Sequence, residues 1–147
     1  MQRSFSSILV AITIALPTGA AAAPGSVERA AIDTYESACL STPISEEGLA
    51  AWARDTGATQ SPQQERHEFV IGHPIKVWRS AAAPHTIYVV LGQQLTCEVW
   101  FQTASPNSAR EAFRRKVLSD IEKADPSEAS VTVFRDGMVT PSVVRSK

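Results

Sequence analysis

The chain has 147 residues, a length that suits one domain, or one domain with a removable targeting segment. Hydrophobic residues make up 44% of it and charged residues 20%, as in ordinary globular proteins, which argues against long disordered tracts and collagen-like repeats. Its 14 basic and 15 acidic side chains give a formal net charge of -1, so the composition offers no reason to expect a nucleic-acid or anionic-membrane partner.

The N-terminus has the three-part layout of a secretory signal peptide. Arg3 supplies a positive charge, the apolar run 8–16 follows without a charge, and Pro17 breaks any helix before an alanine run at 20–23. The apolar run is too short to span a bilayer, which takes about 20 residues. The alternatives are a short N-terminal anchor helix and a buried core helix.

The expected cleavage site lies after Ala22. A cut after Ala23 would place Pro24 next to the broken bond, where its ring is poorly accommodated. Residues 1–22 are therefore predicted to be a signal peptide, and residues 23–147 a single α+β domain. We expect this domain in the periplasm of a bacterium or in its medium, without stable membrane insertion after the signal is removed.

Two helices are predicted at the start of the mature chain. An apolar stripe of Ile32, Tyr35 and Cys39 recurs at helical spacing within residues 26–40. The second helix covers residues 46–56 and buries the side chains of one face. Ser45 is its expected N-cap and Gly57 its expected left-handed C-terminal residue, and Leu49, Trp52 and Ala53 form its predicted buried face.

The middle of the chain is β-like. The polar stretch 58–68 is predicted to be an exposed loop, and a short apolar patch, 69–71, follows it. Strands are expected over 75–78, over the β-branched run 86–91, and over 95–102, which alternates between apolar and polar residues. The last two segments are close enough in sequence to form an antiparallel hairpin.

The C-terminal third predicts a helix followed by a hairpin. Pro106 is typical of the first residue of a helix. Strands are expected over 129–135 and 138–145, joined by the turn dipeptide Asp136-Gly137. Pro141 cannot donate a backbone hydrogen bond, so we expect the last strand at an edge of the sheet.

Taken in order, these elements read ααβββαββ. Hairpin connections favour an antiparallel sheet. The predicted fold class is therefore α+β, with a sheet of four to five strands and three helices packed mainly on one face.

The two cysteines, Cys39 and Cys97, are predicted to form a disulfide. An even cysteine count in an exported protein favours pairing, because an oxidising compartment preserves the bond. Such a bond would tie the first helix to the central hairpin. The alternatives are two buried free thiols, metal ligation without a recognisable spacing, and a nucleophile without a histidine close in sequence.

The chain carries no familiar catalytic motif. It has no glycine-rich phosphate loop, nucleophile elbow, zinc-protease helix or calcium loop, and we predict no catalytic residue and no cofactor. His67, flanked by Glu65 and Glu68, could join His73 in a metal site, since metals accept imidazole and carboxylate together. The alternative is that these histidines are simply solvated.

Aromatic residues offer the best candidate binding surface. Trp100 falls on the polar side of its predicted strand, where an aromatic ring suits recognition. Trp78 and Tyr88 are the expected members of the same patch. The alternative is that a helix or the 58–68 loop covers this face.

Short motifs around both cysteines resemble those of known small proteins. The helix ending Ala38-Cys39-Leu40 and the later strand Thr96-Cys97-Glu98-Val99, behind an N-terminal signal, resemble small exported proteins of proteobacteria that have no assigned activity. This resemblance implies export and one disulfide.

These features favour an exported, soluble, non-enzymatic module that binds an envelope or secreted protein or a small ligand, as an inhibitor, an immunity-type partner or an accessory factor. The first alternative is a small metal-dependent enzyme or metal carrier that uses His67, His73 and the nearby glutamates. The second is a purely structural envelope protein. No nucleic-acid partner is expected.

Overall fold

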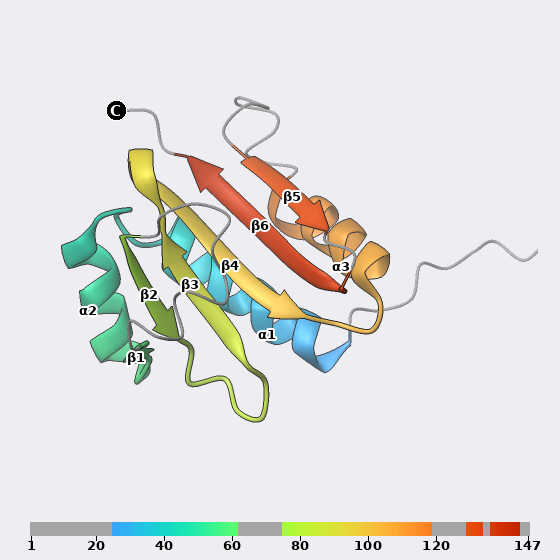
Figure 1. Cartoon of the computed structure of the whole chain (residues 1–147), viewed down its shortest axis with the longest axis horizontal. Helices are drawn as coiled ribbons and strands as arrows, with labels where there is room; N and C mark the ends of the chain where they lie inside the picture. The colour runs from blue at the N-terminus through green and yellow to red at the C-terminus, as the bar shows by residue number, and fades with distance from the viewer. Residues whose placement is uncertain (1–24, 62–74, 119–128, 134–135, 145–147) are drawn as a thin grey trace, which may run out of the picture.

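The computed structural model describes residues 25–61, 75–118, 129–133 and 136–144. Within these ranges, helices cover one face of an antiparallel sheet whose strand order is β1-β2-β3-β4-β6-β5 (Figure 1). The elements are α1 (Ser26–Tyr35), η1 (Glu36–Leu40), α2 (Glu46–Thr56), β1 (Thr59–Gln60), β2 (Lys76–Arg79), β3 (Ile87–Leu91), η3 (Gln93–Leu95), β4 (Thr96–Gln102), α3 (Pro106–Phe113), η4 (Arg114–Leu118), β5 (Ala129–Val133) and β6 (Met138–Val144).

The predicted α+β class with an antiparallel sheet is confirmed, but the strand count is not. The described part of the chain has six strands, because Thr59 and Gln60 pair with Arg79 and Trp78 at the sheet's edge. This pair lies inside the stretch predicted to be a loop. A two-residue polar strand has no apolar alternation, so sequence periodicity could not reveal it.

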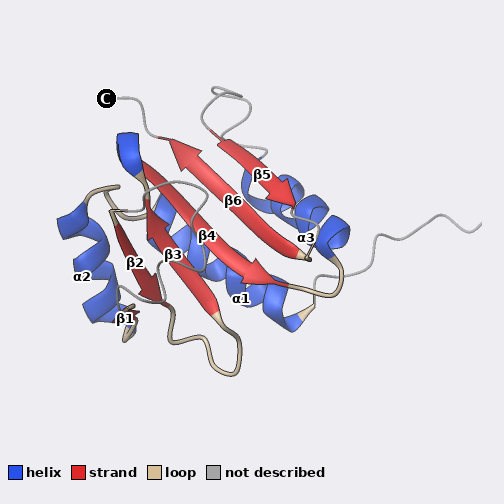
Figure 2. Ribbon diagram, in the orientation of Figure 1, coloured by secondary structure: helices blue, strands red, loops and turns tan. Residues whose placement is uncertain are grey.

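Helices α1 and α3 lie behind the sheet in the view of Figure 2, and α2 lies beside its β1 edge. The side chains of β3 and β4 alternate between the two faces. Those that point toward the helices are almost completely buried: Ile87, Val89, Leu91, Cys97, Val99 and Phe101. This pattern confirms the half-buried strand predicted over 95–102.

Helix α2 begins and ends where the sequence predicts. The Ser45 hydroxyl accepts a hydrogen bond from the Gly48 amide over 3.0 Å, which satisfies one of the unpaired N–H groups of the first turn. Gly57 ends the helix with φ +75°, a left-handed conformation that glycine adopts without strain. Leu49 and Trp52 are buried on its inner face, and the Trp52 indole donates to the Ser37 hydroxyl over 3.1 Å.

The predicted disulfide between Cys39 and Cys97 is confirmed. Both residues are fully buried, and their Cα atoms are 5.5 Å apart. Cys39 lies in η1, a π-helical continuation of α1 that ends where the Ser41 amide donates to the Glu36 carbonyl over 2.9 Å. The bond therefore fixes the end of the first helix to the start of the central strand β4.

The prediction that Pro141 marks an edge strand is wrong. Strand β6 lies between β4 and β5, and Pro141 is fully buried opposite Val131 of β5. The β4–β6 ladder pairs Glu98 with Ser142 and Phe101 with Val139, but makes no pair between them. An interior strand tolerates this proline because the ladder is interrupted at the point where its missing N–H would be required.

Aromatic rings join α1, α3 and β4. The ring of Phe113 lies 5.8 Å from that of Tyr35 in an edge-to-face arrangement and 5.7 Å from that of Phe101. All three side chains are buried. Such pairs add roughly 0.5–1.5 kcal/mol each beyond the area they bury, so this cluster is a principal contact between the helices and the sheet.

The Tyr35 hydroxyl is buried and has no hydrogen-bond partner among the described residues. Burial raises the pKa of this phenol well above its usual value, because the core disfavours the charged phenolate. The folded protein therefore holds the phenol proton at a pH at which the unfolded chain loses it, above about 10. Stability is consequently expected to fall as the pH rises past that point.

Tyr35→Phe is expected to leave the free energy of unfolding at neutral pH unchanged or to raise it by up to about 1 kcal/mol, because it removes an unsatisfied polar group. The same substitution should reduce the loss of stability between about pH 10 and 11. Denaturant melts of the two proteins across this pH range measure both effects. A clear loss of stability at neutral pH would instead show that the hydroxyl makes a bond that the core needs.

Candidate functional site

The face of the sheet that points away from α1 and α3, here called the front face, carries a cross-strand pair of aromatic residues. Tyr88 of β3 and Trp100 of β4 lie directly opposite each other in the strand register. Directly opposed side chains have Cβ atoms about 4.5–5.5 Å apart, so the two rings are neighbours. Both side chains are half-buried, which leaves part of each at the surface.

A carboxylate fixes the position of the tryptophan. The Trp100 indole Nε1 donates to Glu98 Oε2 over 2.7 Å, a short hydrogen bond to a charged acceptor. Glu98 lies two residues before Trp100 on the same strand and therefore on the same face. The indole thus has its one polar group satisfied by a carboxylate of the same strand.

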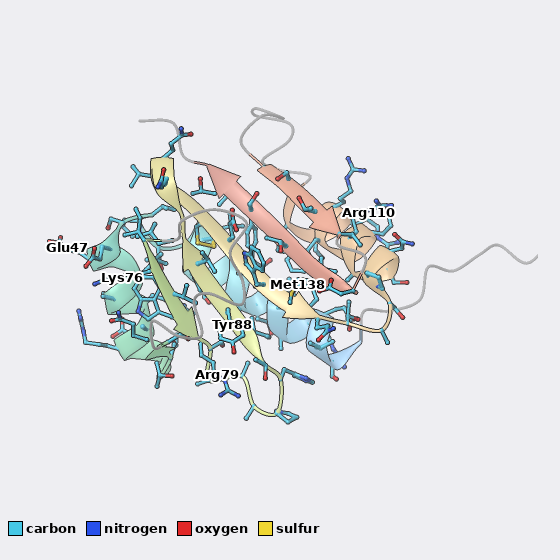
Figure 3. The ribbon with its side chains drawn as sticks, viewed as in Figure 1. Glu47, Lys76, Arg79, Tyr88, Arg110 and Met138 are labelled. Atoms are coloured by element: carbon cyan, nitrogen blue, oxygen red, sulfur yellow. A yellow bond between two sulfur atoms is a disulfide. The ribbon has the colours of Figure 1, made fainter. Side chains whose placement is uncertain are left out.

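Polar residues continue the front face toward β5. Glu98 lies opposite Ser142 of β6, and the Ser142 hydroxyl is 2.8 Å from that of Ser130 on β5. On the other side, Arg79 of β2 lies opposite Tyr88 (Figure 3). The aromatic pair is therefore bordered by a cation on one side and by hydroxyl groups on the other.

The third member of the predicted aromatic surface, Trp78, lies on the other face. Its side chain is only 2% exposed and belongs to the core beneath the helices. The structure thus brings Tyr88 and Trp100 together and separates Trp78 from them. Glu98 lies on the face that the alternation of its strand predicts, whereas Arg79 reaches the same face through its pairing with Tyr88.

The candidate metal residues lie outside the described residues. His67 and His73 belong to the segment 62–74, as do Glu65 and Glu68. In the part of the chain that the structure describes, no group of three histidine, cysteine, aspartate or glutamate side chains could hold a metal ion. Both cysteines are in the disulfide, which corrects the alternatives of free thiols, metal ligands and a nucleophile.

The predicted signal peptide, residues 1–22, also lies outside the described residues. Among the described helices, none is long and apolar enough to cross a membrane.

No protein-family model, curated protein or solved structure matches this chain. The resemblance to small exported proteobacterial proteins is therefore not supported by a match, whereas the single disulfide that it implied is present.

Proposed function

We propose that this chain is an exported, non-enzymatic binding module that engages another envelope or secreted protein through its front face. In this role it would act as an inhibitor, an immunity-type partner or an accessory factor. The observation that carries the proposal is the pair formed by Tyr88 and Trp100, with the indole held by Glu98. Tyrosine and tryptophan are the residues that most often dominate the binding energy of protein interfaces.

The rigidity of this face supports the proposal. Tyr88 and Trp100 project from the central strands of the sheet, and β4 is tied to η1 by the disulfide. Aromatic side chains on a fixed backbone lose little conformational entropy when they bind. The front face therefore suits a preformed contact surface.

The disulfide and the N-terminal sequence together support export. Disulfides persist in oxidising compartments and are rare in the cytosol. The apolar run 8–16 and the alanines that follow supply the targeting signal that such a location requires. The partner is accordingly expected in the bacterial envelope or outside the cell.

A photo-reactive amino acid at position 88, in protein exported by its own cells, is expected to give one discrete cross-linked product with its partner. The same group at Glu47, on the exposed side of α2, serves as the control and should give none. Trp100→Ala should remove the product, because loss of a central aromatic contact weakens an interface by about 2 kcal/mol or more.

Ser130→Ala is the matched variant on the same face, at the far edge of the sheet, and should keep the product. A product that survives Trp100→Ala, or that forms equally from position 47, would contradict the proposed contact surface. Far-UV circular dichroism of Trp100→Ala shows whether its sheet is intact. If this variant does not fold, Tyr88→Ala with the photo-reactive group at Gln102 on the same face tests the same pair.

A further inference from the structure

Strand β5 forms one edge of the sheet, and its outer side has no partner strand in the part of the chain that the structure describes (Figure 1). Strand β1, at the opposite edge, has only two residues, so β5 is the longer of the two edge strands. It contains no charged residue and no proline, two of the features that discourage further pairing at a sheet edge. An uncharged edge rich in β-branched residues is suited to accept another strand.

The direction of the Pro141 nitrogen shows which groups of β6 bond to β5. The Thr103 amide donates to the Gly137 carbonyl over 3.2 Å, so the backbone groups of Gly137 face β4. Directions alternate along an antiparallel strand, so Pro141, an even number of residues later, also faces β4. The β4–β6 ladder lacks a pair at this point, as the missing N–H requires. The backbone groups of its two neighbours, Thr140 and Ser142, therefore face β5.

The outward-pointing groups of β5 follow from this pattern. Ser130 and Thr132 lie opposite the two β6 residues that face β5, and they exchange hydrogen bonds with β6. The backbone N–H and C=O groups of Ala129, Val131 and Val133 therefore point away from the sheet. Their side chains pack against the core, where Ala129 is buried and the two valines are half-buried. An added strand would satisfy these backbone groups and cover the exposed part of both valines.

Helix α3 and its continuation η4 pack against β5 and bring positive charge to this edge. The segment 106–118 carries four basic side chains and one acidic side chain, namely Arg110, Arg114, Arg115 and Lys116 against Glu111. The Arg114 amide bonds to the Arg110 carbonyl, so these two arginines lie one turn apart on one flank of the helix. Figure 3 shows Arg110 on the side of α3 that lies away from α1.

The charge at this edge distinguishes between two kinds of added strand. A second copy of the chain, paired through β5, would bring its own α3 beside the first and place like charges together. The carboxylate of Glu111 lies 3.9 Å from the Arg110 guanidinium, and an exposed pair of this kind offsets little of the positive excess. The edge therefore favours an acidic strand from a different protein.

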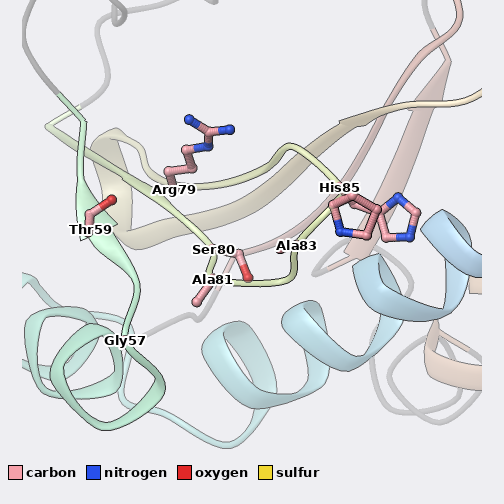
Figure 4. A pocket seen from close by; sticks show the side chains of 8 residues that line it. Gly57, Thr59, Arg79, Ser80, Ala81, Ala83 and His85 are labelled. Carbon is pink, nitrogen blue, oxygen red and sulfur yellow. The ribbon is translucent and has the colours of Figure 1, made fainter.

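The pocket of about 290 Å³ beside the β2–β3 loop does not gather charged groups in this way (Figure 4). Arg79 points away from Ser80 and His85. The Ser80 hydroxyl is engaged by the Ala82 amide, which donates to it over 3.3 Å. Arg79 belongs instead to the front face, opposite Tyr88. Among the described elements, α3 and η4 are thus the ones that combine clustered basic side chains with a neighbouring strand edge.

We propose that the outer edge of β5 binds an extended acidic segment of a partner protein as an added strand. The backbone of this segment would exchange hydrogen bonds with Ala129, Val131 and Val133. Carboxylates on every second residue would lie on the helix side of the sheet, toward Arg110 and Arg114. In this mode of recognition the backbone bonds supply affinity and the alternate side chains supply specificity. The site is separate from the aromatic pair of the front face and does not depend on it.

The test combines the oxidised, ¹⁵N-labelled protein with a capped peptide of alternating threonine and glutamate that is as long as β5. Alternation places every carboxylate on one side of the added strand. In the free protein, the amides of Ala129, Val131 and Val133 should exchange hydrogen with solvent faster than those of Ser130 and Thr132, which bond to β6. The peptide should slow exchange at the three outward amides and shift their NMR signals in a saturable way.

The charge contribution is measured with the double variant Arg110→Gln and Arg114→Gln. It should weaken the affinity for the glutamate peptide roughly fivefold, the size expected for two exposed ion pairs. Arg29→Gln removes the same charge from the exposed side of α1 and should change the affinity less than about twofold. A peptide with glutamine in place of glutamate should bind the native protein as weakly as the double variant binds the glutamate peptide, which tests the charge even if the variant does not fold.

Several outcomes would overturn the proposal. They are the absence of saturable binding, equal affinities for the glutamate and glutamine peptides, and binding of a fully N-methylated glutamate peptide, which keeps the charge but has no backbone donor. Slow exchange at all five β5 amides in the free protein would show that the edge is already occupied within the chain, and slow exchange that appears only as the protein concentration rises would assign the edge to a second copy. None of these measurements involves the front face, so their failure is distinguishable from failure of the cross-linking experiment.

Discussion

Replacing both Cys39 and Cys97 by alanine is expected to lower the free energy of unfolding by about 4 kcal/mol. The disulfide closes a loop over a sequence separation of 58 residues, and its removal returns that loop-closure entropy to the unfolded chain. A domain of this size has only about 5–15 kcal/mol in total, so the variant should be marginally stable. Guanidinium denaturation of the oxidised native protein and the double variant measures the difference.

The native protein treated with a reductant is the matched control, because it loses the same cross-link while it keeps both sulfur atoms in the core. Its midpoint of denaturation should fall close to that of the double variant. Alanine is preferred to serine because a serine hydroxyl at a fully buried position would add a desolvation cost of its own. A loss of less than about 1 kcal/mol in both samples would show that the unfolded chain is already compact without the bond.

Phe113→Ala is expected to cost about 3–5 kcal/mol, the usual effect of emptying a fully buried phenylalanine site. The loss has a specific source here, since the ring contacts both Tyr35 of α1 and Phe101 of β4. Without it, α1, α3 and the sheet would share a cavity. Chemical denaturation followed by circular dichroism measures this effect.

Phe113→Leu is the control for volume, because leucine fills most of the site but has no ring. It should cost less than half as much as alanine. Equal losses for the two variants would indicate that the edge-to-face contact with Tyr35, rather than the filled volume, accounts for the contribution of Phe113.

Local rules accounted for the helices and for the central hairpin. Ser45 and Gly57 carry the chemistry that begins and ends α2, and this chemistry acts within a few residues of each. The alternation of β4 likewise depends only on which face is buried. Both cysteines follow the same logic, because apolar patterning placed each of them on a core-facing side.

The face of Trp78 could not be predicted, because β2 is short and buried on both sides. Val77 and Trp78 are adjacent, yet both are almost completely buried. A strand of this kind has no apolar–polar alternation from which to assign a face. The assignment comes from pairing with β3, where Trp78 lies opposite the core residue Val89.

The positions of β1 and β6 depended on contacts between distant residues. Strand β1 exists because its two residues find partners on β2, and β6 is interior because β4 and β5 pair with its two edges. Strand β2 is distant in sequence from its partner β1, and β4 is distant from its partner β6; only β5 is close in sequence to β6.

The sulfur link divides the backbone into a closed segment and an open one. Helix α2 and strands β1, β2 and β3 all lie between Cys39 and Cys97, whereas α3, β5 and β6 follow the second cysteine. A protease that cuts once between the cysteines leaves two pieces that stay covalently joined, while one cut beyond Cys97 separates the C-terminal piece. A single cut in the first segment therefore leaves the strands that carry Arg79 and Tyr88 covalently attached. A single cut beyond Cys97 instead breaks the covalent connection to the strands that follow it.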